Sequence, residues 1–221
     1  MKTDKITLVP YTKGEEILNC LTHFAGLILP LLIVIEIFPL CKDNTFALIC
    51  AVLYAIGTAL TFLCSFIYHI LPHGNMKKVF RVIDHSAIFF AVAGTITGCV
   101  PQVFLKGSSF GAVMMLIVAW VGVIAGLCLT IFNFEKYKNV RMGLYIFSSA
   151  FSALLGSNTF FNLPLAAFIS LMSGGAVLLV GCVFYKMGAK RRYIHSLFHV
   201  FIVLGLGIFY YGIKNYVYLM L

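Results

Sequence analysis

The stretch RRYIHSLFHV, from Arg191 to Val200, ends a basic loop and opens a long apolar run. Its two histidines, His195 and His199, are four residues apart, so on a helix they extend from one face about one turn apart. They fall just inside an expected membrane span, where an ionisable residue indicates a functional site by default. The pair alone is a weak signal, because histidines at this spacing also serve as packing residues. Whether the pair belongs to a functional site depends on whether other parts of the chain bring polar residues to the same place.

The composition indicates that the solvent of this chain is the lipid bilayer. Of its 221 residues, 62% are hydrophobic and only 10% are charged, and the mean hydropathy is +1.02. Soluble domains carry about 25% charged residues, so a chain this apolar would aggregate in water. The net charge of +9 does not indicate nucleic-acid binding, because the basic residues lie between apolar runs instead of forming one patch.

Seven apolar runs approach or exceed the length of about 20 helical residues that crosses the hydrocarbon core. We predict an all-α integral membrane protein: a seven-transmembrane helix bundle forming one domain over residues 1–221, with a short cytoplasmic segment at 1–16. We expect the first run to remain as a span instead of being cleaved as a signal peptide. The predicted spans are Ile17–Phe38, Thr45–Leu71, Val82–Phe104, Phe110–Phe132, Gly143–Phe160, Leu163–Phe184 and His195–Leu219.

The basic residues favour seven spans over six. The uncharged separator from Asn158 to Pro164 could also be a kink in one long helix. With seven spans, all but three of the 16 lysine and arginine residues fall on the side of the N-terminus, the three being Lys42, Lys106 and Lys214. Merging the fifth and sixth spans would destroy this asymmetry. Positive residues mark the cytoplasmic side, so we predict a cytoplasmic N-terminus and a C-terminus outside.

Small residues are interpreted as packing residues. The seven cysteines are scattered, mostly inside apolar runs, and no Cys-x2-Cys pair occurs. This pattern argues against a disulfide framework or a thiolate zinc site. Several glycines indicate close helix–helix contact; they are Gly122, Gly126, Gly174, Gly175 and Gly181.

Three predicted spans place rare polar residues at a similar depth near the cytoplasmic side. These residues are Ser65 and His69 in the second span, Asp84 in the third, and His195 and His199 in the seventh. Three imidazoles with one open position form a ligand set that zinc uses in catalytic sites, and a nearby carboxylate could hold the metal-bound water. Alternatively, these are interfacial polar groups that bind headgroups and neighbouring helices. Spacing does not separate the two interpretations.

The first span adds a polar stripe at the same end. Glu16, Asn19 and His23 follow at i, i+3 and i+7, so they either line the same cavity or bond the third span. For His23, an interfacial role is an equal alternative. Glu15 is interpreted as an interfacial helix start near the N-terminal dipole, and His85 as a structural or headgroup contact. The centres of the fourth to sixth spans carry no chain of acidic residues, which argues against a proton- or ion-coupled transporter.

Several motifs together resemble the hemolysin III family. That family is the bacterial-type branch of the progestin and adipoQ receptors, which include the adiponectin receptors and are more distantly similar to the alkaline ceramidases. The resemblance runs from about Thr12 to the C-terminus, with five separated blocks in the right order. The motifs are Glu15-Glu16-x2-Asn19-x2-Thr22-His23-x2-Gly26, Ser65-x3-His69, Arg81-x2-Asp84-His85-Ser86 followed by Ala93-Gly94-Thr95, Gly174-Gly175, and His195-x3-His199.

The resemblance implies a seven-helix bundle with a zinc ion inside the cytoplasmic leaflet. His69, His195 and His199 take the places of the metal ligands, and Asp84 and Ser65 take the places that hold the metal-bound water. The resemblance also implies hydrolysis of lipid amides, with ceramide-like substrates in the receptor branch. For bacterial-type members, the name records a cytolytic phenotype, and a role in membrane lipid or energy homeostasis has been suggested.

One departure concerns the third span, which has Gly94-Thr95-Ile96-Thr97-Gly98 where members typically have Gly-Thr-Tyr-Thr-Pro. The loss of Tyr and Pro changes the middle of the span and leaves the metal set intact. It weakens any inference about the shape of the substrate. Hormone recognition, as in the receptor branch, is not expected.

These observations lead to three functional hypotheses for a multi-pass protein of the cell membrane. The first is a zinc-dependent hydrolase of a lipid amide or ester, in which Asp84 is the general base and Ser65 orients water or the oxyanion. The second is a non-enzymatic, zinc-stabilised sensor or receptor. The third, a pore-forming cytolysin, is disfavoured because insertion-competent toxins need a soluble form. The expected partner is membrane lipid and not nucleic acid, and the sequence does not indicate an oligomeric state.

Overall fold

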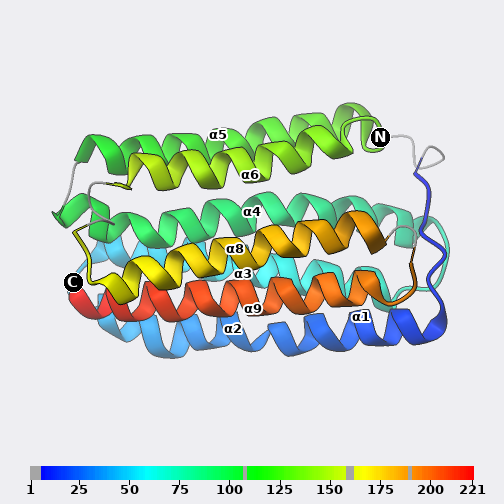
Figure 1. The fold of residues 1–221 in the computed structure, drawn as a ribbon, viewed down its shortest axis with the longest axis horizontal. Coiled ribbons are helices and arrows are strands. Elements are labelled where there is room, and N and C mark those ends of the chain that lie inside the picture. Colours follow the sequence, from blue (N-terminus) through cyan, green and yellow to red (C-terminus); the bar gives the residue numbers. More distant parts are fainter. Residues whose placement is uncertain (1–5, 107–108, 158–161, 189–190) are drawn as a thin grey trace.

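The computed structural model describes residues 6–106, 109–157, 162–188 and 191–221, and all regular structure in this part of the chain is helical (Figure 1). The first rod consists of α1 (Lys13–Gly26), α2 (Ile28–Leu32), a π turn (Ile33–Ile37) and a 3-10 turn (Phe38–Cys41). The remaining elements are α3 (Thr45–Ile70), α4 (Asn75–Lys106), α5 (Ser109–Asn133), α6 (Lys138–Leu155), α8 (Leu165–Gly188), α9 (Ile194–Tyr216) and a 3-10 turn (Tyr218–Met220).

Six helical segments in the described part of the chain are long and apolar enough to cross a membrane. The helix outside this group is α6, which has 18 residues and carries Lys138 and Arg141 in its first two turns. It begins five residues before the predicted fifth span, whose last residues, 158–160, lie outside the described residues. Similarly, α4 begins at Asn75 and not at Val82. In both cases, backbone hydrogen bonding starts in polar sequence before the apolar run begins.

The shape of the first rod follows from local chemistry. The Thr12 side chain and Glu15 form a reciprocal capping box that starts α1. Pro30 explains the break between α1 and α2, because a proline ring clashes with the carbonyl four residues earlier, and that residue is Gly26, where α1 ends. Further along, Glu36 in the π turn pairs with Lys214 of α9, which fastens the far end of the rod to the last helix.

Small residues set the closest helix approaches. A Cβ atom on Gly57 of α3 would lie 2.2 Å from the carbonyl oxygen of Phe90 of α4, so these two helices touch backbone to backbone. A Cβ atom on Gly126 of α5 would overlap the ring of Phe89 on α4. The prediction that Gly175 marks a close helix–helix contact is wrong. Nothing lies within 4 Å of a Cβ atom placed on it, because it faces a cavity.

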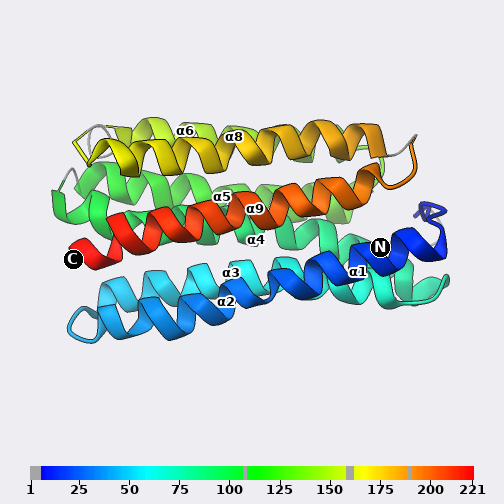
Figure 2. The same cartoon turned by 60° about the horizontal axis from the view of Figure 1, so that its bottom comes forward.

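The helices lie side by side along the longest axis, and the start of α1 and the C-terminus are at opposite ends (Figures 1 and 2). The α3–α4, α5–α6 and α8–α9 connections share the end at which α1 begins. Large apolar side chains cover the outside, and Ile35, Phe110 and Phe132 are each at least 67% exposed. An apolar exterior of this extent fits a lipid environment.

Candidate metal centre and its cavity

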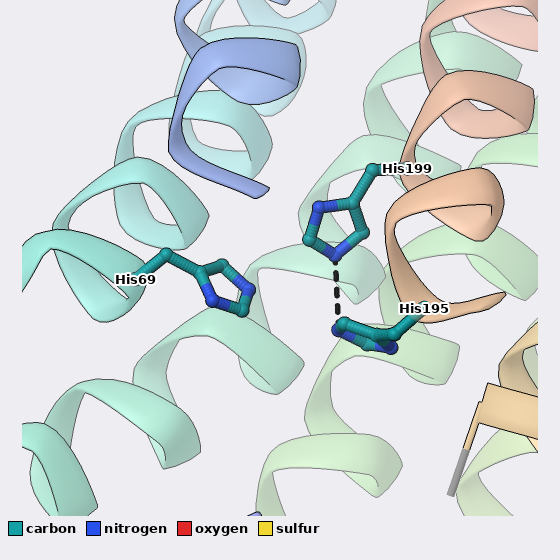
Figure 3. Close-up of side chains that lie close together, drawn as sticks. All are labelled: His69, His195 and His199. Carbon is teal, nitrogen blue, oxygen red and sulfur yellow. Dashed lines mark hydrogen bonds between the residues drawn. The ribbon is translucent and has the colours of Figure 1, made fainter. Parts of the chain in front are cut away.

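Three histidines from two helices converge at the loop-rich end of the bundle. His69 lies in the last turn of α3, and His195 and His199 lie in the first two turns of α9. One nitrogen atom from each ring can be chosen so that all three lie within 4.8 Å of one another. Figure 3 shows the rings pointing toward a common space, with His195 Nε2 and His199 Nε2 3.0 Å apart. This geometry brings together the three residues that the sequence predicts as ligands.

The orientation of His69 is fixed by an ion pair from neighbouring helices. Glu16 of α1 lies with Oε2 2.7 Å from His69 Nδ1, and its Oε1 lies 3.0 Å from the ammonium of Lys77. Lys77 is 1% exposed and donates to the carbonyl oxygens of Tyr68 and Leu71, each at 2.8 Å. A carboxylate can only accept hydrogen bonds, so Nδ1 of His69 carries the proton and Nε2 presents a lone pair.

The orientation of His199 follows from a similar argument. Thr22 Oγ1 donates within α1 to the carbonyl oxygens of Leu18 and Asn19, at 3.0 and 2.9 Å. With its hydrogen used there, the hydroxyl accepts from Nδ1 of His199, 3.5 Å away. The Nε2 lone pair of His199 is therefore directed at the shared space. Asn19 adds a link between helices, because its Oδ1 accepts from Ser196 Oγ at 2.6 Å.

The free nitrogens show that the residues present fit a metal ion. Nε2 of His69 is buried and has no hydrogen-bonding partner, and such an orphaned acceptor is costly without a ligand. Neutral imidazoles whose other nitrogen is held by a carboxylate or hydroxyl are the usual form of a histidine metal site. The three side chains could hold a metal ion, and the donor set alone does not fix which one.

Ser65 and Asp84 lie beside this cluster. Ser65 precedes His69 by one turn of α3, and the carboxylate of Asp84 on α4 lies close enough to its hydroxyl for the two groups to interact. Both line the cavity that His195 and His199 also line. The five residues of the predicted site are thus assembled from three helices, while their chemical roles remain predictions.

His23 reaches the same place without joining the cluster. Its ring lies edge-on to His199, with centroids 4.1 Å apart, and both of its nitrogens are buried without partners. It also lines the cavity, one of the two roles considered for it from the sequence. His85 packs against Phe134 and Tyr185, as expected of a structural contact, and it too borders the cavity.

A family model described as Haemolysin-III related matches residues 11–210. The chain belongs to the Haemolysin-III related family. Hemolysin-3 of Bacillus cereus is 28% identical over 217 residues, covering 97% of both chains. The Hemolysin-3 homolog of Bacillus subtilis (strain 168) is 26% identical over 93% of this chain and 96% of its own. The human Monocyte to macrophage differentiation factor is 26% identical over 92% of this chain and 85% of its own.

Membership of the Haemolysin-III related family confirms the resemblance found from the sequence motifs. Together with the apolar helices, it identifies the chain as a multi-pass protein of the cell membrane. The residues that form the histidine cluster all lie within the matched range.

A long apolar cavity extends from the histidine cluster of this Haemolysin-III related protein. Its volume is about 610 Å³, and it is lined by residues of α3, α4, α6, α8 and α9, with single contributions from α1 and α5. On α9 its lining runs from His195 to Phe209, an axial length of about 21 Å at 1.5 Å per residue. The walls are mostly aliphatic and aromatic, with Ser65 and Asp84 among the polar lining residues and Thr95 and Ser149 further along α4 and α6.

The partial exposure of cavity-lining residues on α6 and α8 indicates that the cavity opens sideways between these two helices. Ile146 of α6 and Met172 and Leu179 of α8 line it, and the same three side chains are 38, 44 and 51% exposed. An opening through an apolar exterior connects the cavity with the surrounding lipid and not with water.

Sequence reasoning missed two cationic residues of the site. Lys77 and Arg141 were counted only as orientation charges, yet both are 1% exposed. Arg141 lines the cavity, stacks 4.4 Å from the centre of the Phe134 ring and has one guanidinium nitrogen without a partner. A signal was present: Arg141, Ser148 and Ser152 follow at i, i+7 and i+11, so they share one face of α6.

Proposed function

We propose that this protein is a zinc-dependent hydrolase that cleaves an amide or ester bond of a ceramide-like membrane lipid. The observation that carries the proposal is the cavity: the histidine cluster, Ser65 and Asp84 lie at one end of a long apolar chamber that opens toward lipid. An acyl chain that enters from the bilayer fits such a space and is held there by dispersion contacts with the apolar walls. A small soluble substrate would gain nothing from the length of the cavity.

We further propose seven spans, counting α6, with the N-terminus in the cytoplasm. Chain ends at opposite ends of the bundle (Figures 1 and 2) support an odd number of crossings. Basic residues gather at the histidine end: Lys136 and Arg192 lie in its connections, and Lys77 and Arg81 lie in the first two turns of α4. This is the bias expected of the cytoplasmic side. This topology puts the cluster in the cytoplasmic leaflet.

Zinc held by His69, His195 and His199 would polarise the scissile carbonyl and lower the pKa of a water molecule. The chain's own residues do the rest. Asp84, held in place by Ser65, removes a proton from the water that attacks the carbonyl carbon. It then delivers that proton to the amine or alkoxide that leaves as the C–N or C–O bond breaks. Arg141 binds an oxygen of the lipid head through its unpaired nitrogen, which fixes the carbonyl near the cluster.

A second candidate is a zinc-stabilised sensor or receptor without turnover, acting in membrane lipid homeostasis. The contacts from Glu16 to His69 and from Asn19 to Ser196 join α1, α3 and α9. Metal binding could therefore set the arrangement of these three helices. Two relatives carry the name Hemolysin-3 or its homolog, and lysis would then be a consequence of altered lipid composition.

Metal analysis of the purified protein, joined to lipidomics of cells, tests the proposal. We expect stoichiometric zinc in the wild type, loss of zinc in His195→Ala, and accumulation of one amide- or ester-linked lipid in cells that carry the variant. Asp84→Asn separates the two candidates: it should keep zinc but show the same lipid accumulation. Protein without metal would refute both candidates, and metal-replete Asp84→Asn with an unchanged lipid profile would favour the sensor.

A further inference from the structure

The residues that precede α1 cross the loop-rich end of the bundle. We call Ile6–Thr12 the N-terminal strap; it has no helical structure and lies at the right edge of Figure 1 in blue. It belongs to no membrane span, and the periodicity of the sequence assigns it no role. Its two ends are nevertheless fastened to the protein at different places.

The first fastening is on α4 and the α5–α6 connection. Ile6 is 3% exposed and packs with Val82 and Phe134. Next to it, the backbone nitrogen and hydroxyl of Thr7 donate to Glu135 Oε1 at 3.2 and 3.0 Å. Arg81 pairs with the same carboxylate and donates to the carbonyl oxygen of Thr7. An apolar anchor and an ion pair therefore hold the beginning of the strap.

The second fastening is on the histidine cluster itself. The Tyr11 ring stacks on His195, with centroids 5.0 Å apart and planes 21° apart. Its centroid also lies 5.7 Å from that of His69. Directly after it, Thr12 starts α1 through its capping box with Glu15, and Glu15 Oε1 accepts from the backbone nitrogen of Tyr193 at 2.9 Å. Tyr11 thus covers the rings on the side of the connections.

The three histidines differ in how their rings are held. Glu16 fixes His69 and Thr22 accepts from His199. Within the described part of the chain, no oxygen atom hydrogen-bonds the ring of His195. Its ring packs against aromatic neighbours, of which Tyr11 is the nearest parallel one. Metal-binding histidines almost always have an outer partner that holds their orientation, and at His195 the stacked ring of Tyr11 occupies that position.

We propose that the N-terminal strap is a lid on the metal centre and that Tyr11 is the positioning residue for His195. The proposal rests on the metal site proposed above. The strap closes the centre toward the aqueous side, while lipid reaches it through the sideways opening between α6 and α8. Release of the strap then exposes the histidines to water-soluble molecules without opening the helix bundle.

Zinc release from the full-length, zinc-loaded protein in nanodiscs, measured with a soluble chelator, tests the proposal. Tyr11→Ala should release zinc faster than the wild type, by about tenfold or more, as for other lost outer partners of metal ligands. Tyr11→Phe, which keeps the stacked ring, should restore the slow rate. Ile6→Ala should also accelerate release, because it loosens the strap at Val82 and Phe134. Lys13→Ala is the matched exposed control and should behave as the wild type.

A second measurement works without metal and separates this proposal from the proposed function. Metal-free protein is treated with diethyl pyrocarbonate, and carbethoxylation of each histidine is followed by peptide mass spectrometry. His195 should react slowly in the wild type and at least severalfold faster in Ile6→Ala and Tyr11→Ala, while exposed His73 reacts equally in all. Equal His195 rates in all variants would overturn the lid. Protein that binds no zinc but shows the expected protection would refute the proposed function and leave the strap as a cover over the histidines.

Discussion

At the scale of single residues, Glu16 holds His69 in the form in which it could bind a metal. Its carboxylate holds the proton of His69 on Nδ1 and compensates the buried charge of Lys77. The sequence placed Glu16 on a polar stripe but could not identify its partners. These are His69 and Lys77, which lie 53 and 61 positions further along the chain. Helical spacing predicts which side chains share a face and not which helices will meet.

Glu16→Gln should weaken zinc binding by about 10- to 100-fold, because an amide accepts a weaker hydrogen bond than a carboxylate and can turn its NH2 toward His69, so that the tautomer is no longer fixed. It should also lower the melting temperature, since Lys77 is left buried with carbonyl partners only. Competition titration against a zinc chelator measures the affinity, and circular dichroism follows unfolding. Glu36→Gln, at the far end of the first rod, is the control and should leave zinc affinity unchanged.

Arg141→Met should separate stability from function. The guanidinium is buried and has an unpaired nitrogen, so its replacement by an apolar side chain of similar volume should leave the melting temperature unchanged or raise it. Zinc content should not change, whereas hydrolysis of the accumulating lipid should fall at least about tenfold through lost positioning. A variant that turns over lipid normally would remove Arg141 from the proposed site.

At the scale of elements, the apolar runs predicted the helices well and the start of each helix less well. α3 follows its predicted span closely, whereas α4 and α6 begin seven and five residues early in polar sequence. Hydropathy responds to where lipid begins, and helical hydrogen bonding continues beyond that boundary. The N-terminal strap had no signal at all, because an extended segment of seven residues that packs at its two ends carries no periodicity.

Gly57→Ala should disturb the metal centre at a distance. The added methyl group would meet the carbonyl oxygen of Phe90 at 2.2 Å, so α3 and α4 must move apart, and these helices carry His69 and Asp84. We expect a lower melting temperature and weaker zinc binding. Gly143→Ala is the matched control, because nothing lies within 4 Å of the added atom and alanine favours the helix; it should be neutral or stabilising.

The strap should loosen only in acid. Burial alone would raise the pKa of Glu135, but Arg81 and Thr7 outweigh it and hold the pKa below its ordinary value of 4.5. Because the pKa of Glu135 is lower in the folded than in the unfolded protein, its ionised carboxylate stabilises the folded state above pH 4.5. This stabilisation is lost as the pH falls through the pKa of the folded state. The difference in melting temperature between wild type and Glu135→Gln should therefore be constant from neutral pH down to 4.5 and shrink below it. A constant difference at lower pH would contradict this assignment.

At the scale of the whole molecule, the sequence predicted the lipid environment and the common depth of the polar residues. The charges of the loops and the positions of the rare polar residues along each span can be read directly from the sequence, and folding does not change which end of a helix they lie at. The cavity could not be predicted, because it arises where α6 and α8 lie apart and Gly175 leaves space. No sequence pattern in either helix indicates that the two helices do not contact each other.

The sideways opening between α6 and α8 has a kinetic consequence. A substrate that enters from the leaflet reaches the protein by diffusion within the membrane. Its rate of binding therefore depends on its mole fraction among the lipids and not on its concentration in the bulk volume. Diluting proteoliposomes with buffer should leave the turnover per protein unchanged. Diluting the substrate lipid with inert phospholipid at fixed protein should slow turnover in proportion, once the leaflet is no longer saturated. Rates that instead follow the bulk volume would mean that substrate arrives through water.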